Sequence, residues 1–140
     1  MPEKSTNDLL KELKGCDTFK SYHVKNAEFY NDTPLSDMLK ELIKKKSLRK
    51  TDVIRRAEIS EIYGFQIFSG ERKPERNKLL CLCIAMRLDF DEIQDLLKKS
   101  GYSQLYVKNP ADCIIIYGIC KGFSVAEINF MLYDYDLQTL

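Results

Sequence analysis

The sequence contains few of the residues that begin and end strands and turns. Among its 140 residues there are 6 glycines and 4 prolines, and tryptophan is absent. A sheet of several strands needs turn residues at short intervals, and this composition does not supply them. Leucine, lysine, glutamate and isoleucine are frequent instead, as in helical proteins. The composition therefore predicts an all-α fold.

Long apolar runs are also missing. Residues 1–15 hold none that would suit a signal peptide, and the longest apolar stretch, Cys113 to Cys120, is too short to span a bilayer. We therefore expect a cytoplasmic protein that contacts no membrane. The length allows one domain with its own core, or a small domain with an appended helical unit.

The chain has one histidine and five cysteines, and these residues form no recognisable site. The odd number of cysteines argues against a disulfide framework. Four of them lie in apolar helical runs, where a thiol behaves as a small hydrophobic group. Cys81 and Cys83 are two residues apart and would point to different sides of a helix, far in sequence from His23. We expect structural thiols and no metal or cofactor.

No catalytic motif stands out in the sequence. A glycine-rich phosphate loop, a histidine-centred acid–base pair and a nucleophile motif are all missing. The pair Asp134 and Asp136 has the wrong spacing for a calcium loop and is typical of a polar helix end. We therefore expect that the protein is not an enzyme.

Charge is distributed unevenly along the chain. Residues 44–78 hold 11 Lys or Arg and 5 Asp or Glu, a net charge of +6, whereas residues 89–140 hold 4 and 8, a net charge of −4. A basic segment can bind phosphates and release their counterions. A solvated helical face has the same composition, so charge alone does not decide between the two interpretations.

Apolar spacing predicts seven helices after a polar N-terminal stretch. Thr33 is the expected N-cap of the first of these helices, with Pro34 in its first turn. A short helix around Val53 is followed by a break at Glu58 and by a new helix with Ser60 as N-cap. That helix covers residues 61–69 and ends at Gly70. Four more helices follow, and the polar residues 1–33 are expected to form an N-terminal helical arm.

The last four predicted helices contain a repeat. A shift of 35 positions superimposes the apolar phase of residues 79–105 on that of residues 114–140, with Ile93 over Ile128 and Leu97 over Leu132. Stacked helical hairpins bury their apolar faces on each other. The alternative is a coincidence between two amphipathic helix pairs, because such pairs are common.

Residues 34–97 resemble the Cro and lambda-repressor type of helix-turn-helix protein, also called the xenobiotic response element family. A short helix, a tight turn and a second helix followed by glycine, basic residues and proline form this arrangement. The residues that carry the resemblance are Leu48, Val53, Ala57, Ile59, Ser60, Ile67, Ser69, Gly70, Glu71, Arg72, Lys73, Pro74 and the run Leu79 to Leu88.

The resemblance implies a five-helix domain over residues 34–102 that binds double-stranded DNA. The first helix of the motif would rest on the phosphate backbone, and the second would lie in the major groove. The C-terminal hairpin, residues 103–140, would pack on this domain. The residues implied for DNA binding are Arg49, Lys50, Glu61, Ile62, Tyr63, Phe65, Gln66, Ser69, Arg72 and Lys73.

Two departures from the family pattern affect the motif. Glu58 stands where the turn usually has glycine, so it must adopt a left-handed conformation or the turn must take another shape. Where many members of the family have a small residue and then a large one that faces it, this chain has the large Ile54 and then Gly64. The two changes would compensate each other in volume.

Two functions are consistent with this motif. The first is a sequence-specific transcriptional regulator, a repressor by resemblance, whose symmetric operator would require a homodimer. The second is a protein-interaction module, because Ile62, Tyr63 and Phe65 would form an apolar surface. Gln66 is a suitable adenine reader, whereas Glu61 can accept only from a cytosine amino group.

The cysteine analysis leads to a direct prediction. Denatured protein that was prepared without reductant should show five reactive thiols in a colorimetric titration, because the sequence offers no disulfide framework. Metal analysis should find no stoichiometric zinc. About one bound zinc per chain would contradict the structural interpretation of the thiols.

Overall fold

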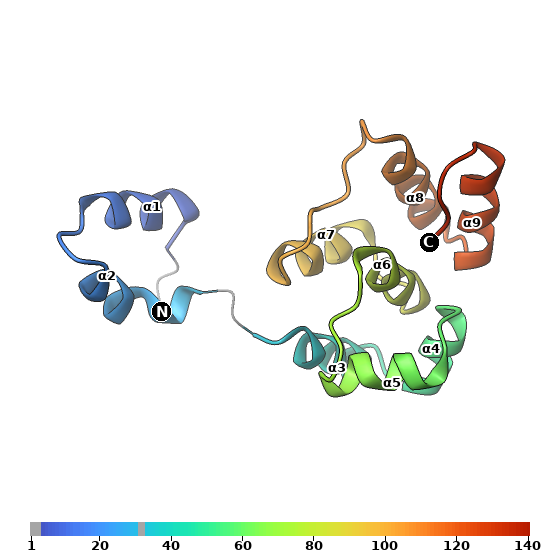
Figure 1. Ribbon diagram of the computed structural model, residues 1–140, viewed down its shortest axis with the longest axis horizontal. Coiled ribbons are helices and arrows are strands. Elements are labelled where there is room, and N and C mark those ends of the chain that lie inside the picture. The colour runs from blue at the N-terminus through green and yellow to red at the C-terminus, as the bar shows by residue number, and fades with distance from the viewer. Residues whose placement is uncertain (1–3, 31–32) are drawn as a thin grey trace. The chain divides into compact units, whose positions relative to one another are not determined.

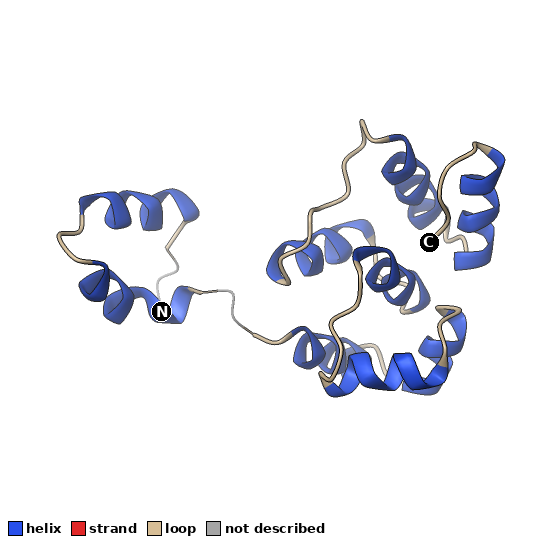
Figure 2. Cartoon of the chain, in the orientation of Figure 1, coloured by secondary structure: helices blue, strands red, loops and turns tan. Residues whose placement is uncertain are grey.

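The computed structural model describes residues 4–30 and 33–140, and these residues form helices and loops without any strand (Figure 2). The expected all-α class is therefore confirmed. The chain divides into two compact units, one within Met1–Asp32 and one comprising Thr33–Leu140. No described helix is long and apolar enough to cross a membrane.

The N-terminal unit is a small helical hairpin with its own capping. Ser5 and Asp8 form a capping box at its start, and the Thr18 side chain accepts from Ser21 N. Lys4 Nζ lies 2.7 Å from Glu12 Oε1, and this bond, with one from Asn26, lowers the pKa of the Glu12 carboxyl. The elements are α1 (Thr6–Gly15), α2 (Phe19–Asn26) and the 3₁₀ turn η1 (Ala27–Phe29).

The second unit consists of helices joined by short loops (Figure 1). Ser60, Asp89, Asn109 and Ser124 each accept a backbone N–H at the start of a helix, which satisfies donors that the helix itself leaves free. The helices are α3 (Leu35–Lys45), α4 (Lys50–Arg56), α5 (Glu61–Ser69), α6 (Arg76–Ala85), α7 (Phe90–Lys99), α8 (Pro110–Lys121) and α9 (Val125–Asp134).

The start of α3 differs from the prediction. Thr33 is exposed and lies outside the helix, and Pro34 occupies the N-cap position with an extended backbone, so the assignment of Thr33 as N-cap was wrong. No side chain caps this end. The carbonyl of Pro34 instead accepts from Asp37 N and Met38 N, and the fixed φ of proline suits the entry to a helix.

Helix α6 is the centre of the second unit. Every residue from Leu79 to Met86 is buried, so the helix is covered on all sides. It contacts α4 on one side and α9 on another, and Figure 1 shows it between the α3–α5 layer and the C-terminal helices. Both parts of the expected division at residue 102 contribute to this one core.

The cysteines differ in their surroundings. Cys81 and Cys83 are buried in α6, and desolvation raises the pKa of the Cys81 thiol to about 11 and that of Cys83 further. Cys113 and Cys120 are exposed on α8, so their expected role as small core residues was wrong. When most residues of a helix are apolar, as in α8, the sequence pattern does not show which side of the helix is buried.

The helix pairs α6–α7 and α8–α9 lie at the 35-residue spacing that the sequence predicts. Their boundaries agree within about a residue after the 35-residue shift. Leu105 N donates to the side-chain oxygen of Gln94 at 2.7 Å, and Leu140 N donates to that of Asn129 at the same distance. The equivalence therefore extends from the helices to the segment that follows each pair.

One ion pair fixes the start of α8 on the start of α6. Arg76 donates to both carboxylate oxygens of Asp112, at 3.1 and 3.0 Å, and also to the carbonyls of Ser103 and Gln104. Asp112 is buried and additionally accepts from Tyr106 N. The connection between α7 and α8 is held against α6 by these charge-assisted bonds.

Asp112→Asn should lower the free energy of unfolding by about 1.5–3 kcal/mol, because it removes the charge that Arg76 faces. Urea unfolding followed by circular dichroism measures this change. Asp95→Asn is the matched control, since its pair with Lys99 is exposed and should contribute about 0–1 kcal/mol. Equal effects of the two substitutions would contradict a special role for Asp112.

Candidate nucleic-acid interface

The segment from Lys50 to Ser69 forms two helices joined by a tight turn. Helix α4 ends at Arg56, and Glu58 follows with φ of 58°, the left-handed conformation that the sequence left as one of two alternatives. Glu58 N donates to the carbonyl of Arg55. Ser60 then caps α5 by accepting from Tyr63 N. The turn is completed without glycine.

Ile54 and Gly64 set the distance between the two helices. A Cβ atom built on Gly64 would lie 2.6 Å from Cγ1 and 2.7 Å from Cγ2 of Ile54. No real side chain tolerates that contact unless its neighbour moves. Ile54 therefore occupies the space that a side chain at Gly64 would need, so the two positions are complementary in volume.

One side of α5 is exposed and the opposite side is buried. Gly64, Ile67 and Phe68 face the core. At about 100° per residue, the implied base-reading residues share the opposite side of the helix. Ile62 is 74% exposed, whereas Phe65 is 39% exposed. Glu61, Ile62, Phe65 and Ser69 are exposed, and Tyr63 and Gln66 are half-buried at the edges of this face.

Some polar groups at the end of α5 already take part in local hydrogen bonds. The Ser69 hydroxyl donates to the carbonyl of Gln66 and accepts from Glu71 N. The same Gln66 carbonyl also accepts from Arg72 N. In this conformation Ser69 has no proton left for a phosphate or base, whereas the side-chain amide of Gln66 makes no bond within the described residues.

Three of the four implied phosphate-binding cations lie over aromatic rings. Lys50 Nζ is 5.4 Å from the ring centroid of Phe68, and Arg72 Cζ is 5.8 Å from that of Tyr63. Lys73 Nζ is 5.0 Å from the ring centroid of Tyr102. Such contacts orient a cation while its charge stays accessible.

The same cations have no carboxylate partner among the described residues. Arg49, Lys50, Arg72 and Lys73 form no salt bridge there, whereas Lys46, Arg55 and Arg76 pair with Glu92, Asp52 and Asp112. Exposed acids also lie in this region, at Glu58, Glu61 and Glu71. Residues 49–73 hold six Lys or Arg and four Asp or Glu in all, so the net charge of the interface segment is +2.

Sequence reasoning did not identify the aromatic rings that orient these cations. Tyr102 is distant in sequence from Lys73, and its hydroxyl donates to the carbonyl of Pro74. Burial, and to a lesser degree Tyr63, raises the pKa of the Tyr102 hydroxyl, so it remains a donor at neutral pH. No local pattern signals this contact, because it depends on the tertiary position of the segment after α7, which brings Tyr102 beside Lys73 and Pro74.

Comparison with protein-family models, curated proteins and solved structures found no match to this chain. The residues in 4–30 and 33–140 also contain no cluster of three or more His, Cys, Asp or Glu that could hold a metal ion. The interface is therefore interpreted from its own geometry.

The effect of Gly64→Ala on the free energy of unfolding should depend on residue 54: the substitution should destabilise the protein beside Ile54 and stabilise it beside alanine. In the natural chain, the added methyl group meets Ile54 and should lower the free energy of unfolding by about 1–3 kcal/mol. In an Ile54→Ala background the space is free, so the same change should stabilise by up to about 1 kcal/mol through the higher helix propensity of alanine.

The natural chain, the two single variants and the double variant form a double-mutant cycle. Chemical denaturation of these four proteins measures the coupling free energy between positions 54 and 64 directly. Gly15→Ala serves as the control for propensity, because no atom lies within 4 Å of a Cβ built at Gly15. An equal cost of Gly64→Ala in both backgrounds would show that Ile54 does not set the helix spacing.

Proposed function

We propose that the protein is a sequence-specific DNA-binding regulator with a five-helix domain of the lambda-repressor type. In this proposal α5 lies in the major groove and the start of α4 rests on the phosphate backbone. A symmetric operator would then require two copies of the chain. By resemblance the regulator acts as a repressor.

The observation that carries the proposal is the set of cations at the two ends of the motif. Arg49 and Lys50 stand at the start of α4, and Arg72 and Lys73 follow α5, without a carboxylate partner in the described part of the chain. A polyanion that neutralises them would release counterions. The remaining charge of +2 is also a better match for phosphate than for a basic partner.

Each group on the interface suits a particular part of the duplex. The cations at the two ends of the motif would contact phosphates and set the register, without reading sequence. Gln66 can form two bonds to adenine, and Ile62 can contact a thymine methyl. Glu61 disfavours phosphate and restricts the bases opposite it to cytosine.

A second function is favoured by one specific observation. The Ile62 side chain is 74% exposed, with Phe65 beside it on the same face of α5. Large apolar groups in such a position are typical of a protein contact. In this alternative the helix-turn-helix fold is an interaction module, and Ile62, Tyr63 and Phe65 bind another chain.

Substitutions on the interface separate base reading from phosphate binding. On a preferred sequence obtained by selection from random duplexes, Gln66→Ala should cost about 1–3 kcal/mol and relax the base preference. Lys50→Ala or Arg72→Ala should weaken binding to all sequences and lower the salt slope by about one ion. Glu61→Gln should strengthen non-specific binding. Fluorescence anisotropy over a range of salt concentrations measures all four.

Lys98→Ala is the control, because Lys98 is an exposed lysine on α7, outside the motif. Thermal unfolding of each variant distinguishes lost contacts from lost structure, which matters most for Lys50 over Phe68. If the four substitutions leave affinity and salt slope unchanged while Phe65→Ala abolishes binding to a protein partner, the interaction module replaces the DNA-binding regulator.

A further inference from the structure

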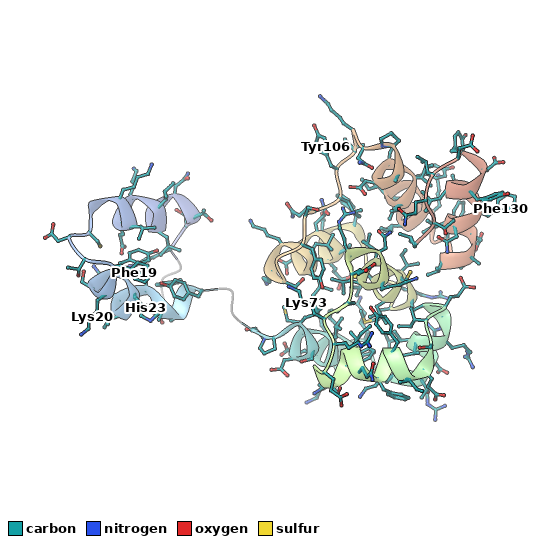
Figure 3. The ribbon with its side chains drawn as sticks, viewed as in Figure 1. Phe19, Lys20, His23, Lys73, Tyr106 and Phe130 are labelled. Atoms are coloured by element: carbon teal, nitrogen blue, oxygen red, sulfur yellow. The ribbon has the colours of Figure 1, made fainter. Side chains whose placement is uncertain are left out.

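Helix α9 presents two large aromatic side chains to solvent. Phe130 is 71% exposed and Tyr133 is 76% exposed. Figure 3 shows Phe130 projecting from the outer side of α9, away from the other helices of its unit. At about 100° per residue, Ala126, Phe130, Tyr133, Glu127 and Asp134 share one side of the helix within about 120°. We call these five residues the α9 face.

The equivalent positions of α7 show that the fold does not require aromatic residues there. After the 35-residue shift, Phe130 corresponds to Asp95 and Tyr133 corresponds to Lys98, and both of these residues are exposed. Asp95 pairs with Lys99 at 3.0 Å. The same helix in the same repeat is therefore stable with a charged outer side. Two aromatic groups in water contribute little to folding, which suggests that another molecule covers them.

Charge restricts what that molecule can be. Residues 122–140 contain three acids, Glu127, Asp134 and Asp136, and no lysine, arginine or histidine. Glu127 uses one carboxylate oxygen to cap α9, and Asp134 makes no hydrogen bond within the described residues. Arg55, Arg56 and Arg87 line a cavity at the start of α9 together with Glu127, but no cation forms a salt bridge with Glu127 or Asp134 within the described residues. A partner that covers the face would therefore supply apolar groups for the two rings and positive charge for these carboxylates.

The rings also lack the cations that several other aromatic rings of this chain have. Lysine or arginine groups lie over Tyr63, Phe68, Tyr102 and Tyr117 at 5.0–5.8 Å. Within residues 4–30 and 33–140, no cation lies over Phe130 or Tyr133, although both rings are accessible. An arginine or lysine from a partner would add a cation–π contact to the ion pairs.

We propose that the α9 face is a docking surface for a basic amphipathic helix of a partner protein. The partner helix would set an apolar stripe against Phe130 and Tyr133, and flanking arginines against Glu127 and Asp134. A duplex is excluded as the occupant by the negative charge of the α9 face. The α9 face takes no part in the proposed DNA binding by α5, so the failure of one proposal would not affect the other.

The test uses the full chain and two labelled synthetic peptides, each an 18-residue helix with a leucine stripe. One peptide has arginines beside the stripe and the other has glutamates. Fluorescence anisotropy should show binding of the arginine peptide that weakens with salt. The double substitution Phe130→Ser and Tyr133→Ser should reduce this affinity by about tenfold or more, as loss of central aromatic anchors does.

The double substitution Asp95→Ser and Lys98→Ser is the matched control, since it changes the equivalent positions of α7. It should leave the affinity for the arginine peptide unchanged, and circular dichroism should show native helix content in both variants. The proposal is overturned if the Phe130 and Tyr133 variant binds the arginine peptide as well as the natural chain does. It is also overturned if the glutamate peptide binds equally to the same face.

Sedimentation of the natural chain and of the Phe130 and Tyr133 variant, without peptide, tests a different occupant. Two copies of the α9 face would bring carboxylates of like charge together, so no change in mass is expected between the two proteins. A dimer that dissociates when both residues are substituted would overturn the proposed partner, because a second copy of the chain would then cover the face.

Discussion

Burial of α6 on every side from Leu79 to Ala85 is the constraint on which the second unit depends. A helix that has no exposed side cannot be stabilised by one neighbour, so α4 and α9 must both cover it. Each buried aliphatic side chain contributes about 1.5–3 kcal/mol, which makes this helix the largest apolar contribution in the unit. Arg56 donates to the carbonyl of Ala85 near the end of α6, so the motif is anchored there by a polar contact as well.

The candidate interface follows from this arrangement. With α4 fixed on α6, the contact between Ile54 and Gly64 determines how closely α5 approaches, and the exposed side of α5 is what remains after Ile67 and Phe68 enter the core. Cations at both ends of the motif are then oriented by the ring of Phe68 in the core and by that of Tyr102 in the segment after α7. Affinity for an anion would therefore come from a rigid surface, and little side-chain freedom would be lost on binding.

Much of the fold could be predicted because its signals are local. The cap at Ser60 is predicted from the sequence and confirmed by the structure, and the 35-residue apolar register is matched by the positions of the helices and by the bonds at Leu105 and Leu140. The N-cap at Thr33 failed because proline at the next position carries the helix entry by itself. Other contacts join residues that are far apart in the chain, such as Lys73 over Tyr102 and the pair of Arg76 with Asp112. A local sequence pattern does not predict such contacts.

The repeat also provides an internal comparison of backbone strain. Arg87 and Gly122 are equivalent residues in the turns of the two hairpins, with φ of 57° and 73°, and only glycine adopts this region freely. Gly101 and Asp136 form a second such pair, with the two residue types in the opposite order. Each hairpin therefore keeps one relaxed and one strained turn. A left-handed residue other than glycine costs about 1–2 kcal/mol of stability. Neither hairpin is therefore as stable as its fold allows, and further substitutions could stabilise both.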